Sequence, residues 1–214
     1  MTTLGFYPLV ILTMSQANSP TPFTPLLYAA ISAIQPMAPD DMELILPVMT
    51  HKTLKKDGLL LRENEVCRHI FFLGSGLVRM YYLDESGHEI NYRFTDAGHF
   101  FVDFQSFLTQ QPSRYYWQAL QDSEILLFPY TAIQQIYQRS PAWTNFGRVM
   151  AEHVYLQLNQ RVEMLLFMKP EERYRSVVST NPGLIKQVSL LHLSSYLGIK
   201  PESLSRIRKR MSAR

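Results

Sequence analysis

The sequence of 214 residues contains a single cysteine, Cys67, and no lysine or arginine before Lys52. One cysteine excludes a disulfide within the chain and any iron–sulfur or zinc site built from four cysteines of one chain. The apolar segment 4–12 lacks the cations that precede a secretory signal core, is interrupted by Pro8, and is much shorter than a membrane span. These absences predict a cytoplasmic protein with no membrane partner.

The sequence also lacks the short motifs of common enzyme classes. No Ser-His-Asp spacing, Walker loop or dinucleotide glycine motif rises above chance. Metal-dependent β-barrel enzymes bind iron or zinc through histidines, and four lie along the middle of this chain: His51, His69, His88 and His99. No His-x-His pair or spaced His/Glu triad accompanies them. We therefore predict that the chain is not an enzyme and has neither catalytic residues nor a metal site, with such a barrel enzyme as a distant alternative.

Positive charge is scarce overall but concentrated at one end. The formal net charge is only +3, and 46% of the residues are apolar, enough for one large or two modest domains. Of the 21 lysines and arginines, six lie between Lys200 and Arg214. A basic C-terminus of this kind favours contact with nucleic acid.

The N-terminal part divides into a tail and two short helical segments. Residues 1–25 are rich in Pro, Ser and Thr, so we expect a flexible tail, with Met14 as an alternative start. Segments 26–35 and 40–49 then have the spacing of helices.

Alternation with a period of two follows, from 51 to 128. Glycine-containing turn signals such as Lys56-Asp57-Gly58 and Asp96-Ala97-Gly98 separate the apolar runs. Short antiparallel strands at this spacing form a barrel or roll. We expect this roll, with the preceding helices, to occupy 26–139.

A long helix is predicted next, over 140–168. Ser140 supplies an N-cap and Pro141 suits the first turn. Apolar residues then recur every three or four positions, at Trp143, Phe146, Met150, Val154, Leu158, Val162 and Leu165. At ~1.5 Å per residue the helix spans roughly 40 Å, longer than a small domain needs. We expect it to pair with its copy in a homodimer; packing on its own barrel is the alternative.

Residues 169–214 have the pattern of a helix-turn-helix. A helix that begins after Ser189 ends at Gly198, which can adopt the left-handed conformation, and a second begins at Pro201. The small Ser194 allows the two helices to approach. Their shared apolar face comprises Leu193, Leu197, Ile199, Leu204 and Ile207. This spacing is typical of DNA-binding domains.

The second helix presents hydrogen-bonding groups followed by cations. Its candidate DNA-binding residues are Glu202, Ser203, Ser205, Arg206, Arg208 and Lys209. Arg206 and Glu202 lie four residues apart, so both can contact base edges in a major groove, whereas the others suit phosphates. The alternative is a solvated basic helix stabilised by i,i+4 pairs.

Residues 195–209, Ser-Tyr-Leu-Gly-Ile-Lys-Pro-Glu-Ser-Leu-Ser-Arg-Ile-Arg-Lys, resemble the recognition segment of the Crp/Fnr family of transcription regulators. With Glu172-Arg-Tyr174, they resemble most closely the branch common in Bacteroidetes-type bacteria. Two departures stand out. No wing hairpin follows the recognition helix, and His192 stands where a capping-box Glu is expected.

The resemblance implies an α+β fold with N-terminal helices and an antiparallel β-roll of the cyclic nucleotide-binding-like, double-stranded β-helix type. A dimerisation helix and a C-terminal helix-turn-helix complete it. The β-roll is then the effector-sensing domain. The implied partners are double-stranded DNA carrying a near-palindromic operator, a second copy of the chain, and RNA polymerase.

The resemblance also locates a candidate effector pocket at Gly98, Asp103, Ser113 and Arg114. Family members that bind cyclic nucleotides have a Glu for the ribose and an Arg-Ser pair for the phosphate. Without a gap, Asp103 takes the place of the Glu and Ser113 that of the Arg. Arg114 comes one residue late, which on a strand reverses its face.

A phosphate without its bidentate Arg loses a charge-assisted pair, so we do not expect cyclic AMP binding. No cofactor is predicted. An unknown effector stays open, because the aromatic side chains of 100–117 could line an apolar pocket or form plain core.

We therefore predict a homodimeric, sequence-specific DNA-binding regulator of transcription. The alternative is a small-molecule or partner-binding module whose helix-turn-helix no longer binds DNA.

Overall fold

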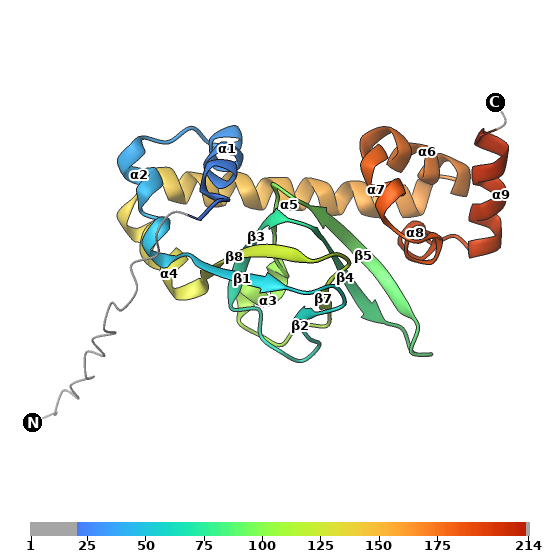
Figure 1. Cartoon of the computed structure of the whole chain (residues 1–214), viewed down its shortest axis with the longest axis horizontal. Helices are drawn as coiled ribbons and strands as arrows, with labels where there is room; N and C mark the ends of the chain where they lie inside the picture. Colours follow the sequence, from blue (N-terminus) through green and yellow to red (C-terminus); the bar gives the residue numbers. More distant parts are fainter. Residues whose placement is uncertain (1–20, 213–214) are drawn as a thin grey trace, which may run out of the picture.

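The computed structural model describes residues 21–212, so Met14 and most of the predicted tail lie outside the described residues. The molecule is organised along one long helix, with the N-terminal helices at one end, the β-roll beside its middle and the C-terminal helices at the other end (Figure 1). Helix α1 spans Thr24–Ile34 and so begins within the segment expected to be tail. Pro25 suits its first turn and Thr24 is buried, which explains the earlier start.

The predicted helix over 40–49 was wrong in its length. Helix α2 spans only Pro39–Glu43, and a separate 3₁₀ turn, η1, spans Leu46–Val48. Pro47 has no backbone N–H to continue an α-helix, so the segment is divided in two.

The β-roll consists of two four-stranded antiparallel sheets, in the orders β1-β8-β3-β6 and β2-β7-β4-β5. The first sheet contains β1 (Thr50–Leu54), β8 (Ser123–Pro129), β3 (His69–Ser75) and β6 (Phe100–Phe101). The second contains β2 (Leu59–Leu61), β7 (Tyr116–Ala119), β4 (Leu77–Leu83) and β5 (Glu89–Asp96). Helix α3 (Phe104–Thr109) connects β6 to β7.

Two apolar cores hold the roll together. Between the sheets, Trp117 and Phe101 are fully buried and their rings lie 4.7 Å apart. On the outer face of the first sheet, Phe72 and Phe128 pack against α1 and against helix α4, Tyr130–Arg139. Successive residues of one strand point to opposite faces of the sheet and so belong to different cores, as the period of two predicts.

The long helix α5 spans Pro141–Phe167, close to the predicted range, with the Ser140 side chain capping its start. Its first turns pack on the N-terminal helices and the roll through Trp143 and Phe146. The N-terminal half of α5 therefore fits the alternative interpretation, in which the helix packs on the roll of its own chain.

Four helices form the C-terminal unit. They are α6 (Pro170–Thr180), α7 (Pro182–Gln187), α8 (Leu190–Leu197) and α9 (Pro201–Ser212). Helix α7 was not expected from the sequence. The core of this unit also includes Leu77 of β4, so the roll and the C-terminal helices share one apolar cluster.

Candidate DNA-binding surface and effector pocket

The turn between α8 and α9 has the geometry that the sequence predicts. Gly198 has φ of 62°, in the left-handed region, and its N–H bonds to the last turn of α8. The Ile199 N–H donates to the Ser194 carbonyl at 3.0 Å. Ser194 is buried, and all five residues of the predicted apolar face are buried as well. The two helices therefore pack as a helix-turn-helix.

Helix α9 turns its charged face away from this core. Glu202, Arg206 and Lys209 are exposed. Ser205 is also exposed, whereas Ser203 and Arg208 are half-buried. Arg206 Nη2 donates to Ser203 Oγ at 3.3 Å, and Arg210 forms a 2.6 Å ion pair with Glu171 of α6. Arg210 thus connects α9 to α6, and the outer surface of α9 presents Glu202, Ser205, Arg206 and Lys209.

The carboxylate at the predicted ribose position has a structural role. Asp103 is 4% exposed, and its Oδ1 accepts a hydrogen bond from the Ser106 N–H at 3.2 Å, which caps α3. Ser106 Oγ in turn accepts from the Cys67 N–H at 2.9 Å. A ribose would have to compete with the helix cap for this carboxylate.

The predicted phosphate position has no cation. Ser113 is buried, and its Oγ accepts a hydrogen bond from the Tyr115 N–H at 2.9 Å. Arg114, the next residue, is exposed. Gly98, with φ of 85°, lies in the turn after β5 and donates its N–H to the Leu73 carbonyl of β3 at 2.7 Å. The Arg114 side chain therefore lies at the surface and is not buried in the cassette.

The aromatic side chains of the cassette are mainly core. Phe101, Phe107 and Trp117 are buried between the sheets. Tyr92 and Tyr115 are half-buried with ring centroids 5.2 Å apart, and burial raises the pKa of both phenols.

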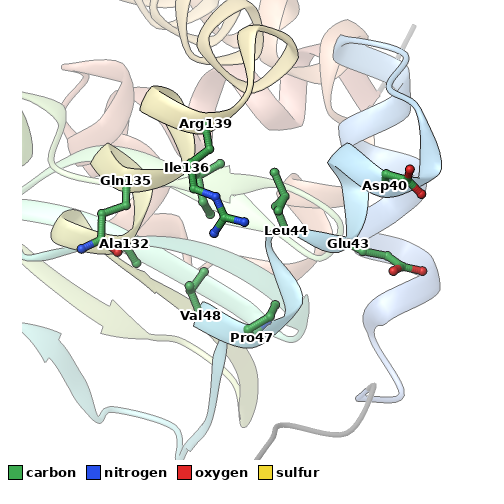
Figure 2. Close-up of a pocket in the computed structure, with 9 residues that line it drawn as sticks. All are labelled: Asp40, Glu43, Leu44, Pro47, Val48, Ala132, Gln135, Ile136 and Arg139. Carbon is green, nitrogen blue, oxygen red and sulfur yellow. The ribbon is translucent and has the colours of Figure 1, made fainter. Parts of the chain in front are cut away.

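Two surface hollows lie elsewhere. The first, of about 310 Å³, lies between α2 and α4; in Figure 2 the Arg139 guanidinium points into it, whereas the carboxylates of Asp40 and Glu43 point away. The second, of about 390 Å³, is lined by residues of the roll that include Lys52 of β1, Leu61 of β2 and His69 of β3. Neither has a set of buried, converging polar groups, which a specific ligand site requires.

A buried charged residue was missed by the sequence analysis. Arg79 of β4 is 3% exposed, in a strand read as a simple alternation. Its Nη2 pairs with Glu89 at 2.5 Å, and its Nη1 lies 3.1 Å from His192 Nδ1 on α8. The sequence has no local signal for this contact, because a charged residue between apolar ones is ordinary in an alternating strand and His192 lies 113 positions away.

The single cysteine is not a candidate reactive thiol. Cys67 is buried, and burial raises the pKa of its thiol to about 11. Within residues 21–212 no group of three or more His, Cys, Asp or Glu side chains is arranged to hold a metal ion. In the same range, no helix is both long and apolar enough to cross a membrane.

The second half of α5 carries an exposed apolar stripe. Tyr155, Val162 and Leu166 follow at steps of seven and four, so they lie on one face, and they are 67%, 50% and 70% exposed. Leu158 and Leu165 flank them and are also exposed. On the opposite side, Met164 is buried.

One family model matches the β-roll. Residues 51–140 match the model of the cyclic nucleotide-binding domain. No curated protein sequence matches the chain.

Solved structures match over most of the chain. FixK2 from Bradyrhizobium japonicum is 18% identical with a TM-score of 0.65, covering 78% of this chain and 85% of that one. The c-di-GMP-responsive global regulator CLP from Xanthomonas campestris is 16% identical with a TM-score of 0.65, covering 82% and 92%. The catabolite activator protein of Thermus thermophilus is 17% identical with a TM-score of 0.55, covering 86% and 87%. At these identities the likeness establishes the fold.

Proposed function

We propose, from its cyclic nucleotide-binding domain at residues 51–140 and its Crp/Fnr fold, that this protein is a sequence-specific DNA-binding regulator of transcription. The observation that carries the proposal is α9, whose apolar side is buried while its polar and cationic side is exposed. A helix of this kind after a tight turn suits a major groove. The proposed parts are the sensor at 26–139, the dimerisation helix at 140–168 and the DNA-binding domain at 169–214.

Within α9 the side chains differ in their proposed roles. Arg206 and Glu202 are exposed in the first half of α9 and are four residues apart, so we assign them to base edges. Ser203, Ser205, Arg208 and Lys209 are assigned to phosphates and positioning. Phosphate contacts are the same for every DNA sequence and govern the salt dependence of DNA affinity, whereas base contacts govern sequence preference.

Dimerisation is proposed through the exposed stripe of α5. A contiguous apolar face on a monomer marks an interaction surface, and a helix face of this length suits the same helix of a second copy. Two copies related by a two-fold axis would present their α9 helices to successive major grooves, about 34 Å apart, so the operator is expected to be a near-palindrome. RNA polymerase is the further partner that such a regulator would contact.

We propose that the roll does not bind cyclic AMP. Asp103 is engaged in capping α3 and Ser113 offers no positive charge, so a cyclic phosphate would lose its bidentate partner. Gly98 and Arg114 complete the candidate pocket, and whether it has a small-molecule effector at all is left open in this proposal. The protein is not proposed to be an enzyme, and it is expected to act in the cytoplasm.

A selection experiment tests the proposal. The purified full chain is incubated with sheared genomic DNA at low and moderate salt, with and without cyclic AMP, and the retained fragments are sequenced. We expect a palindromic motif that does not depend on cyclic AMP. Weak, salt-insensitive retention without a motif would instead favour a binding module whose helix-turn-helix no longer grips DNA, and a motif that requires cyclic AMP would refute the pocket assignment.

A further inference from the structure

The C-terminal unit is attached to an open edge of the β-roll. Strand β5 is the outer strand of its sheet, so within residues 21–212 the backbone groups on its far side have no strand partner. Helix α8 covers this edge (Figure 1). Ser195 Oγ accepts a hydrogen bond from the Asn91 N–H at 2.8 Å and donates to the Glu89 carbonyl at 3.0 Å. One hydroxyl on α8 thus satisfies two groups that an edge strand would leave open.

A buried guanidinium extends this contact into the sheet. Arg79 Nε and Nη2 donate to Gln118 Oε1 on β7 at 2.9 and 2.5 Å, and Nη2 pairs with Glu89. Its Nη1 donates to Asn91 Oδ1 at 3.2 Å and points to His192 Nδ1 at 3.1 Å. Arg79 therefore connects three strands of the roll with α8.

The geometry fixes the proton state of His192. A guanidinium can only donate, so His192 Nδ1 must accept the hydrogen bond with its lone pair. The Asn91 Nδ2, at 3.4 Å from the same nitrogen, is also a donor. The docked arrangement thus requires a neutral ring. A proton on Nδ1 would point the N–H of His192 at the N–H of Arg79, and it would place the positive charge of the imidazolium beside that of the guanidinium.

The second contact of α8 contains no histidine. Arg161 of α5 lies 4.1 Å over the Tyr196 ring and donates to the Tyr196 carbonyl. Its Nε and Nη1 are buried without a hydrogen-bond partner within residues 21–212. Phe94 of β5 packs on Tyr196 with ring centroids 5.3 Å apart. This contact also supports docking.

We infer that Arg79, Asn91, His192 and Ser195 form a proton-sensitive latch that holds the helix-turn-helix unit against the β-roll while His192 is neutral and releases it when His192 is protonated. The inference rests on the proposed function for its biological meaning, because the released unit is the proposed DNA-binding domain. The latch itself concerns only how the two parts of the chain are held together.

The charges around His192 determine the direction of the effect. Arg79 on β4 faces it, together with Glu89 on β5 and Asp57 in the turn between β1 and β2. Burial and then the Arg79 charge lower the pKa of His192, while the two carboxylates raise it; the net direction is downward. Docking is therefore fully favoured above the ordinary histidine value of about 6.5 and weakens as the pH falls below it.

Hydrogen exchange of the Asn91 amide tests the latch without any DNA. This amide donates to Ser195, so its protection reports docking directly. Exchange is followed by NMR between pH 7.5 and pH 5.5 in the full chain and corrected for the intrinsic rate. We expect protection to fall by up to about tenfold per pH unit below ~6.5, because one proton is taken up on release. The amide of Trp117, in the core of the roll, should keep its protection.

Three variants distinguish release of the latch from a general loss of stability at low pH. His192→Gln keeps an acceptor for Arg79 but cannot titrate, so its Asn91 protection should not depend on pH. His192→Arg places a second cation beside Arg79 and should give low protection at every pH. His88→Gln, at the exposed tip of the β4–β5 hairpin, is the matched control and should behave as the parent.

Either of two results would overturn the inference. One is protection of Asn91 that does not change with pH in the parent chain. The other is an equal pH dependence in His192→Gln. Because no DNA is present, a chain that fails to bind any operator would still give a readable answer on the latch.

Discussion

The proposed dimer can be tested by shortening one side chain of the exposed stripe on α5, because the loss of association free energy can be worked out from the area that side chain would bury. Leu166 is 70% exposed in the single chain and lies on the same face as Tyr155 and Val162. Full burial of a leucine side chain contributes about 1.5–3 kcal/mol, so burying this share contributes about 1–2 kcal/mol. A symmetric dimer contains the residue twice. Leu166→Ala should therefore weaken association by about 2–4 kcal/mol, or about 30- to 700-fold in Kd.

Sedimentation equilibrium over a wide protein concentration range measures this Kd. Gln160→Ala is the matched control, because Gln160 is exposed on the same helix but lies on a different face. The control should dimerise as the parent does. If Leu166→Ala associates within about threefold of the parent, the stripe is not the dimer interface, and the burial estimate behind the prediction is wrong.

Three further outcomes are expected. Arg206→Ala should cost roughly 1–3 kcal/mol of binding free energy on a selected operator and relax base preference, whereas Lys209→Ala should weaken binding to operator and random DNA about equally. Competition titrations at fixed salt distinguish the two variants. If Arg206→Ala also loses affinity for operator and random DNA equally, the assigned roles are wrong. Gly198→Ala forces a side chain into the left-handed region and should destabilise the C-terminal unit by about 1–2 kcal/mol in thermal melts, while an unchanged melt would argue against this turn. Cys67, whose thiol pKa is raised to about 11, should resist alkylation at pH 8 until the chain unfolds, and rapid labelling of the native protein would show an open core.

Much of the helix-turn-helix could be predicted because its signals are local. Gly198 and Pro201 mark the turn by their backbone preferences, and the apolar residues on both sides have helical spacing. The roll was predictable for the same reason, since alternation and glycine turns are properties of short segments. The comparisons confirm the Crp/Fnr-type fold, while the Bacteroidetes-type branch stays a prediction.

What sequence reasoning missed depends on contacts between distant residues. Arg79 and His192 are 113 positions apart, and nothing local to either one indicates that α8 docks on β5. A bulge between Met80 and Tyr81 in the β4–β5 pairing also disturbs the simple alternation assumed there. Asp103 was placed by family pattern, yet its capping of α3 depends on the fold of the cassette.

Methylation interference on a selected operator tests the central claim most directly. Methylation of guanine N7 blocks the major groove, and methylation of adenine N3 blocks the minor groove. If two α9 helices enter successive major grooves, N7 methylation should block binding in two symmetric half-sites one helical turn, about 34 Å, apart. Interference confined to adenine N3, or confined to one half-site, would contradict the account of a two-fold symmetric dimer that contacts DNA through α9.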